Sequence, residues 1–411
     1  MSGLSFFLVV LSVIFALGNF LFFPLPAVPP SAAPFFIAET SERKPAAGSK
    51  EQDAPSLESL LPRLQEIYVT RANVLLTGAD PEKIVPLYDQ EARLGRWALS
   101  HEQTKIAYMQ NWAKKRGVRI VEAKVNLDVK WSKLQKESAE FNIWQTLVLG
   151  YQYPDEKDQV NRFGIGTRHS VRLVKKNGLW LVQRDWYTDP LGDDTLVPKP
   201  VPADGSADLN IVLSNDPNNG NPSNTSASPN PVYDRAGAVR YADRFAGLAV
   251  IDGEKKYNPR YRDLNGRGGD CTNFVSQVLG DREGGKLPMD SVWYYRYDGR
   301  GGCGSTAWVQ TDSFASWLLY GGRAVRLAKG TFPEVGLPGP KFPRSAVREL
   351  QVGDLIAYEE KHDIQHFAVV TGFDSKGYPL VNAHTADRYH CPWDIGWDHT
   401  TVFHLFRIKE N

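Results

Sequence analysis

The sequence predicts a mixed α+β protein with two folded domains. Its 411 residues exceed the usual size of one domain. Its apolar periodicity changes from helical to alternating within the first half, and a stretch rich in Pro, Asn and Ser follows. Hydrophobic residues make up 42% and aromatic residues 11%, which excludes a wholly disordered chain. A formal net charge of +1 argues against nucleic-acid binding, which usually needs a basic excess.

The first 38 residues have the composition of a targeting segment. Residues 4–23 are almost entirely apolar and long enough to cross a bilayer, and no charged residue precedes Glu39. Prolines between positions 24 and 30 would end a helix there. We therefore expect residues 1–38 to be a signal peptide or an amino-terminal membrane anchor, and residues 39–56 to be a polar spacer. Either form predicts a secreted or membrane-anchored, extracytoplasmic protein.

The next segment, residues 57–196, reads as an α+β domain. Apolar residues recur at helical spacing after Ser56, and two further helical stretches cover 81–94 and 100–116. The pattern then alternates, which predicts strands at 119–130, 141–153, 166–175 and 179–187. Asn177-Gly178, between the last two, is a strong hairpin signal because both residues accept positive φ.

This order of elements resembles the cone-shaped NTF2-like domains, in which helices pack on an antiparallel sheet. The resemblance rests on topology alone. The domain's two histidines, His101 and His169, have no carboxylate cluster beside them in the sequence. We expect each to be a surface or satisfied histidine, and the domain to be a binding or spacer module.

Residues 197–230 predict a flexible linker, because a Pro-, Asn- and Ser-rich segment cannot bury an apolar face. The second domain, residues 231–411, opens with a predicted helix at 233–248. Its most informative string is Gly-Gly-Asp-Cys-Thr-Asn-Phe-Val-Ser-Gln at 268–277.

Cys271 is the candidate nucleophile in this string. The two glycines allow a sharp turn, and Asp270 is a good N-cap residue, so Cys271 falls in the first turn of a helix. The positive end of the helix dipole favours the thiolate there. The Cys271 N–H is also free to bind an oxyanion. The alternative is that Cys271 is a small buried hydrophobe.

A second segment supplies candidate partners for the cysteine. Strands are predicted at 352–358, 366–372 and 380–385, with His366 at the head of the second. Asn382 and His384 are two residues apart and so share a face of the third strand. If the connecting loop covers 373–377, His384 lies opposite His366, and a one-residue slip would remove both from that face. Either Asn382 or His384 could then hold His366 in the right tautomer.

Residues 233–408 resemble an amidase-like domain family of bacterial exported proteins, related to the NlpC/P60 and CHAP group of papain-like cysteine hydrolases. The core match is Gly269 to Gln277, with Tyr233-Asp234-Arg235, Ala238-Val239, Asn258-Pro259, Tyr261, Trp293-Tyr294-Tyr295, Ser305, Trp308, Gly353-Asp354, His366 and His384-Thr385. The resemblance implies a papain-like fold, in which the nucleophile helix packs on a small antiparallel sheet.

The same resemblance implies roles for individual residues. Cys271 would be the nucleophile, His366 the general base and His384 the third member, with Asn382 as the alternative. The Cys271 backbone at the helix start that Asp270 caps would bind the oxyanion, with Asn265 as a side-chain candidate. No metal or organic cofactor is implied. The expected substrate is cell-wall peptide or another amide, and the expected reaction passes through a thioester.

Several alternatives stay open. The spacing of His384, His390, Cys391 and His399 fits no standard zinc pattern, so a zinc site is the weaker chemistry. Cys303 and Cys391 could pair in an oxidising compartment or remain free thiols. Trp293, Tyr294 and Trp308 are candidates for a substrate groove, but such aromatic residues also pack cores. The domain could instead bind wall peptide without hydrolysis, or transfer the acyl group to an amine. The sequence does not indicate an oligomeric state.

Overall fold

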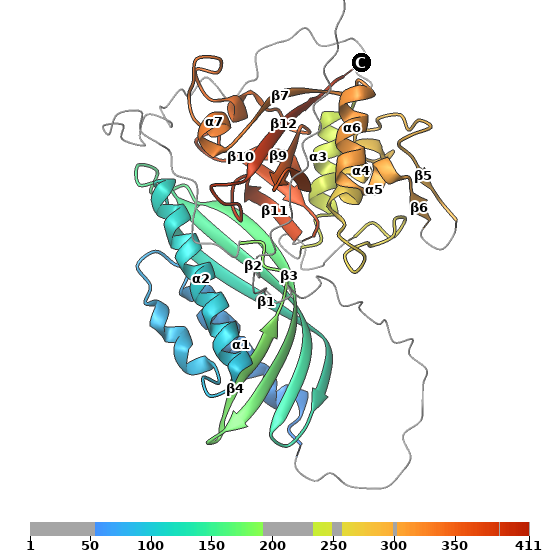
Figure 1. Cartoon of the computed structure of the whole chain (residues 1–411). Helices are drawn as coiled ribbons and strands as arrows, with labels where there is room; N and C mark the ends of the chain where they lie inside the picture. Colours follow the sequence, from blue (N-terminus) through green and yellow to red (C-terminus); the bar gives the residue numbers. More distant parts are fainter. Residues whose placement is uncertain (1–53, 192–232, 249–256, 299–301, 386, 411) are drawn as a thin grey trace, which may run out of the picture. The chain divides into compact units, whose positions relative to one another are not determined.

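The computed structural model describes residues 54–191, 233–248, 257–298, 302–385 and 387–410 (Figure 1). These residues all belong to one compact unit, Ser49–Asn411. The predicted targeting segment, most of the spacer and the predicted linker lie outside the described residues. Within the described ranges, no helix has both the length and the apolar character needed to cross a membrane.

The amino-terminal elements follow the predicted order. Ser56 caps the first helix, because its side chain accepts a hydrogen bond from the Ser59 N–H. Asn177 (φ 50°) and Gly178 (φ 82°) form the predicted hairpin turn. The elements are α1 (Leu57–Asn73), η1 (Pro81–Leu87), α2 (Arg93–Lys115), β1 (Arg119–Leu134), β2 (Ser138–Gln152), β3 (Asn161–Lys176) and β4 (Leu179–Trp186).

Strands β1 to β4 form an antiparallel sheet, and α1 and α2 lie along it (Figure 1). Side chains from both layers, among them Leu64, Trp112, Ile143 and Leu149, form one buried core. The α+β prediction is confirmed for this segment. Its assignment to the NTF2-like domains stays a prediction.

The two histidines of this segment have carboxylate partners that the sequence did not reveal. His169 Nδ1 lies 2.9 Å from Asp185, and His101 Nε2 lies 3.0 Å from Asp189. Burial lowers the pKa of His169 despite the opposing effect of Asp185. Both histidines are therefore satisfied as predicted, but the expectation that no carboxylates stand beside them is wrong, because β4 and the residues after it bring Asp185 and Asp189 to them.

The carboxyl-terminal region places helices on one face of further antiparallel strands. Leu355, Phe367 and Val369 of the sheet pack on α4 and α6 in a second buried core. Its elements are α3 (Arg235–Arg244), α4 (Cys271–Gly280), β5 (Tyr295–Arg296), β6 (Cys303–Gly304), α5 (Thr306–Val309), α6 (Thr311–Tyr320), β7 (Ala324–Gly330), α7 (Phe332–Gly336), η3 (Ala346–Glu349), β8 (Leu355–Glu360), β9 (Asp363–Phe373), β10 (Pro379–Ala383), β11 (Asp387–Pro392) and β12 (Val402–Ile408).

One sheet runs through both segments, in the order β1-β2-β3-β11-β10-β9-β8-β12-β7, with β4 also paired to β3. The junction is the antiparallel pair of β3 and β11, where Asp387 lies opposite Gly166. The strands approach closely at this glycine, since a Cβ at Gly166 would lie 2.4 Å from Cδ2 of Leu248 and 3.1 Å from Cβ of Asp387. The sequence shows no trace of this strand pair.

A buried carboxylate strengthens this junction. Asp394, which follows β11, accepts hydrogen bonds from Arg116 Nε at 2.8 Å and from Trp112 Nε1 at 3.1 Å. All three side chains are buried. Since charges far from water are stable only when paired, α2 and the segment after β11 depend on each other here.

We predict that Asp394→Asn lowers the free energy of unfolding by about 3–5 kcal/mol, because it leaves the Arg116 cation buried without its partner. Urea unfolding would measure the change. The control is Asp128→Asn, which breaks the half-exposed pair with Lys130 and should cost less than about 1 kcal/mol. If both variants lost the same free energy of unfolding, the buried pair would not stabilise the protein more than the exposed pair does.

Candidate active site

The turn before α4 sets the position of the candidate nucleophile. Gly268 (φ 103°) and Gly269 (φ 119°) both lie in the region that favours glycine, and Cys271 is the first residue of α4. The predicted apolar face of this helix is buried. The local structure therefore agrees with the turn and helix predicted from the string.

Asp270 occupies the N-cap position, but its carboxylate makes no capping bond within the helix. Its Oδ1 accepts from the Leu264 N–H at 2.9 Å and from Asn273 Nδ2 at 2.8 Å. Its Oδ2 lies 2.6 Å from Nδ1 of His384. Asp270 thus joins the loop before α4, the helix itself and the segment after β10.

Both ring nitrogens and both ring faces of His384 contact neighbouring groups. Its Nε2 lies 2.6 Å from the Phe245 carbonyl, and its ring stacks between Tyr257 and Phe274, with centroids 4.0 and 3.9 Å away. Because a carboxylate and a carbonyl both accept, each ring nitrogen donates, and the ring is an imidazolium. Two aromatic faces favour such a cation.

The electrostatics of His384 agree with this assignment. Burial opposes the charge, but the Asp270 hydrogen bond, the Asp270 and Asp387 carboxylates and the Phe245 carbonyl outweigh it and raise the pKa of His384. Tyr257, which donates to Asp387, lies more than 100 residues from His384 in sequence, so no local signal could have identified it. A charged ring with both nitrogens engaged is not placed to orient His366.

Cys271 is buried, and burial raises the pKa of its thiol. The neighbouring Asp270 carboxylate also raises it, while the N–H groups of Phe367 and Thr272 and the Thr272 hydroxyl, 3.8 Å from the sulfur, lower it. The Cys271 N–H has no acceptor among the described residues. The helix start supplies the expected donors, but burial outweighs them, and the resting thiol is protonated.

The register of β9 and β10 decides where His366 points. Leu380 pairs with Gly372, whereas Val381 pairs with Val370, so Thr371 is an extra residue in β9. Asn382 then lies opposite Val369, and the same register continued would place Phe367, not His366, opposite His384. The expected pairing of the two histidines is not formed. The turn pairs Phe373 with Pro379, a register that by itself would place Ala368 opposite His384, and the bulge then shifts the register by one residue and turns His366 to the other face.

His366 consequently lies on the other face of the sheet from α4. Its ring is 5.7 Å from Tyr358 and 5.6 Å from Trp397, measured between centroids. Its Nε2 is buried without a partner, and no hydrogen bond joins His366 to Cys271 or His384. Burial and the Arg388 cation lower the pKa of His366 to about 3.

The alternative third residue, Asn382, is also engaged elsewhere. Its Oδ1 accepts from the Thr371 hydroxyl at 3.0 Å and from the His390 N–H at 2.7 Å. Its Nδ2 donates to Asp243 on α3 at 2.9 Å. Asn382 therefore fastens the bulge to α3 and does not contact His366.

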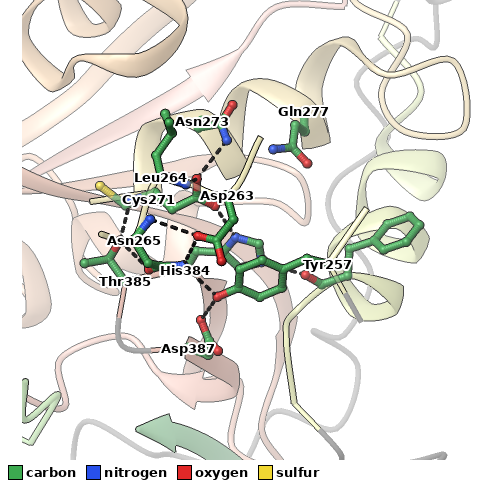
Figure 2. A network of polar contacts seen from close by, with 12 residues as sticks. Tyr257, Asp263, Leu264, Asn265, Cys271, Asn273, Gln277, His384, Thr385 and Asp387 are labelled. Carbon is green, nitrogen blue, oxygen red and sulfur yellow. Dashed lines mark hydrogen bonds and ion pairs between the residues drawn. The ribbon is translucent and has the colours of Figure 1, made fainter. Parts of the chain in front are cut away.

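Asn265, the side-chain oxyanion candidate, lies in the same network as Cys271 (Figure 2). Its Nδ2 donates to Tyr257 Oη at 3.1 Å and to Asp263 at 2.7 Å, and its Oδ1 accepts from Thr385 at 3.3 Å. Its amide hydrogens are therefore engaged within the loop. The Cys271 N–H is the better-placed oxyanion donor.

The aromatic candidates divide between core and surface. Trp293 and Trp308 are 0% exposed, stack 4.7 Å apart, and donate to Ser276 and Asn273 of α4. Their burial corrects the groove assignment, since they support α4 from behind. Tyr294 does line an open groove of about 1100 Å³, together with Ser305, Asp312, Trp317 and Tyr320.

The residues considered for a metal site or a disulfide do not come together in the described part of the structure. All three cysteines are free thiols; Cys303 is exposed and Cys391 is buried. His390 bonds to Asp243 at 2.9 Å. In the described part of the chain, no three or more His, Cys, Asp or Glu side chains are grouped to hold a metal ion.

Comparison with known proteins finds similarity in the carboxyl-terminal region. Residues 232–406 match the family model described as "Putative amidase domain". Uncharacterized protein YhbB of Bacillus subtilis (strain 168) is 32% identical over 164 residues, which are 39% of this chain and 44% of YhbB. The chain thus covers less than half of that relative. No solved structure gives a significant match. The predicted resemblance of this region to an amidase-like domain family is thus confirmed over residues 232–406 by the family match.

Proposed function

We propose that residues 232–406 hydrolyse an amide bond with Cys271 as the nucleophile. The observation that carries the proposal is the placement of Cys271 as the first residue of α4, inside the family match, with an unbonded N–H of its own. The Phe367 N–H also faces its sulfur. A thiol beside free main-chain donors at a helix start suits attack on a carbonyl, because those donors stabilise the developing oxyanion.

The mechanism begins with transfer of the thiol proton to a base. The sulfur then attacks the carbonyl carbon, the amine leaves with a proton, and water releases the acid from the thioester. We assign the base to His366, which directly precedes Phe367. In the resting structure the thiol pKa is raised and the His366 pKa is about 3, so this transfer is unfavourable. Because His366 lies on the other face of the sheet from Cys271, rotation of its side chain does not bring the ring to the thiol, and the proposed transfer also requires β9 to change its register on substrate binding.

His384 has a positioning role in this proposal. Asp270 is adjacent to Cys271, and its negative charge opposes the thiolate. The His384 imidazolium neutralises that charge and keeps the turn in place. His384 thus acts on the nucleophile through Asp270, not through His366.

We propose cell-wall peptide or a related amide as the substrate, and an extracytoplasmic location, secreted or membrane-anchored. The apolar run at residues 4–23 supports the location. The open groove beside Tyr294 is not lined by Cys271, so the proposed substrate class is supported by the amidase-like family match and not by this groove.

A non-hydrolytic, peptide-binding domain is the second candidate. It is favoured by the absence of any hydrogen bond between Cys271 and His366 and by the occupation of both His384 nitrogens. Acyl transfer shares the thioester step with hydrolysis. Analysis of the products after adding a primary amine separates the two reactions.

Amine release from purified muropeptides should fall by at least about 10³-fold in Cys271→Ala, because the covalent step is lost. The matched control is Cys303→Ala, which removes the exposed thiol and should keep the wild-type rate. Equal rates for the wild type and Cys271→Ala would exclude the mechanism. Absence of turnover in all three proteins, with the peptide still bound, would favour the second candidate.

Alkylation rates should report the resting state of the thiol. With iodoacetamide near pH 7, we expect exposed Cys303 to react faster than Cys271, because burial shields the sulfur and raises its pKa. Mass spectrometry of tryptic peptides would give both rates across a pH series. Fast alkylation of Cys271 at pH 6–7 would contradict the resting state described above.

The Asp270–His384 pair should stabilise the fold in a pH-dependent way. His384→Gln should cost about 3–5 kcal/mol at pH 5–6, because it leaves Asp270 buried without a cation. Since the folded pKa of His384 is raised, its contribution is complete below the unfolded pKa of about 6.5 and declines as the pH rises through the folded value. Urea unfolding from pH 5 to 9 would follow this decline.

The control for this experiment is His390→Gln, which breaks a more exposed pair with Asp243. It should cost less than about 1 kcal/mol. A loss in His384→Gln that stays constant or grows with pH would rule out the imidazolium assignment.

A further inference from the structure

We infer that Arg388, Trp397 and His366 form a binding site for a small monovalent anion of the carboxylate class. The site lies on the face of the sheet opposite α4, next to β9 and β11. It does not rest on the proposed hydrolysis, since it is argued from the buried polar groups of Arg388 and Trp397, which take no part in the catalytic steps; it shares only His366 with the proposed mechanism.

Arg388 is a buried cation without a counter-ion. Its side chain lies on β11 and the residue is 4% exposed. Its two terminal nitrogens donate to the main-chain carbonyls of Ile395, at 2.5 Å, and Pro190, at 2.8 Å. Its Nε is buried without a partner, and among the described residues no carboxylate lies within ion-pair distance. A buried charge in this state is costly unless an anion pairs with it.

Asp394 is the carboxylate nearest to this cluster in its electrostatic effects, but it already pairs with another cation. Asp394 and Arg388 both influence the buried hydroxyls of Tyr108 and Tyr358. Asp394, however, is bound to Arg116, with Trp112 as a second donor. Among the described residues, the cluster thus holds two guanidinium ions and one carboxylate, so Arg388 has no carboxylate partner within this part of the chain.

Trp397 lies beside the Arg388 cation, and His366 lies beside Trp397. The guanidinium carbon lies 5.6 Å from the Trp397 ring centroid, and the His366 ring lies 5.6 Å from the same indole. The Trp397 Nε1 and the His366 Nε2 are both buried without partners. An indole N–H and a guanidinium can only donate, so the missing ligand must accept hydrogen bonds. The Arg388 charge excludes a cation and favours an anion.

The environment also limits the size of the ligand. His366 is 6% exposed, and Tyr358 stacks on Trp397 at 4.2 Å, so there is little free surface. Trp397 is half-buried and gives the site an edge toward solvent. Acetate, a halide or the terminal carboxylate of a peptide has suitable charge and size. Such an anion would offset Arg388, one of the two causes that lower the pKa of His366, and would make His366 a stronger base.

Bromide and acetate are the probes for the native protein. Crystals soaked in sodium bromide should show an anomalous peak in contact with Arg388 Nε and Trp397 Nε1. In solution, Tm should rise in a saturable way with acetate, at ionic strength held constant with gluconate. This pair of measurements needs no variant. No peak at the site and no acetate-specific change in Tm would overturn the inference.

Trp397→Phe keeps the ring and removes the indole donor. We expect it to weaken acetate binding about tenfold, as read from the concentration that gives half of the Tm change. The matched control, Trp131→Phe, alters an indole that is 48% exposed on β1 and should leave acetate binding unchanged. Equal acetate affinity in both variants would count against a site at Trp397.

The source of the anion can be distinguished without turnover, in Cys271→Ala protein. Calorimetry would compare acetyl-dialanine with its carboxyl-terminal amide. Binding of the acid that acetate displaces, with no binding of the amide, assigns the site to a peptide terminus. Binding of acetate alone assigns it to a free small anion. Equal binding of the acid and the amide, unaffected by acetate, would contradict a carboxylate site.

Discussion

The hydrogen bond between Asp270 and His384 is the interaction on which the candidate site depends. It links the residue before the nucleophile to the segment after β10, and His384 extends the link to the end of α3 through the Phe245 carbonyl. Because both partners are buried, each requires the other as its counter-charge. The position of Cys271, the start of α4 and the packing of Tyr257 all follow from this pair.

The extra residue in β9, Thr371, also decides which side chains lie near Cys271. The bulge at Thr371 sends Phe367 and Val369 toward α4 and His366 toward Tyr358 and Trp397. One face of the sheet therefore holds the thiol and the imidazolium, and the other holds a neutral histidine near an unpaired arginine. Cys271 and His366 therefore have no contact in this structure, and the chemistry that we propose requires both to change their surroundings.

The amino-terminal and carboxyl-terminal segments of the chain are joined by direct contacts as well as by the chain between them. Pairing of β3 with β11 continues one sheet through both, and Asp394 binds Arg116 and Trp112 of α2. Stability of the amino-terminal segment is therefore coupled to the region that carries Cys271. A change in α2 is expected to affect the carboxyl-terminal strands, because the buried Arg116 cation is bound to the Asp394 carboxylate.

Local patterns in the sequence were sufficient for the α+β class, the Asn177-Gly178 hairpin and the helix that begins at Cys271. Each depends on residues that are neighbours in the chain: turn glycines, a run with helical spacing, or alternating strands. The family of residues 232–406 followed from the string around Cys271 for the same reason. The pair of Asp270 with His384 and the junction of β3 with β11 join residues more than one hundred positions apart, and the register of β9 and β10 depends on the turn and the bulge between them. A one-residue bulge leaves no mark in hydrophobic periodicity, and counter-charges are chosen by proximity in space, so only the tertiary structure decided them.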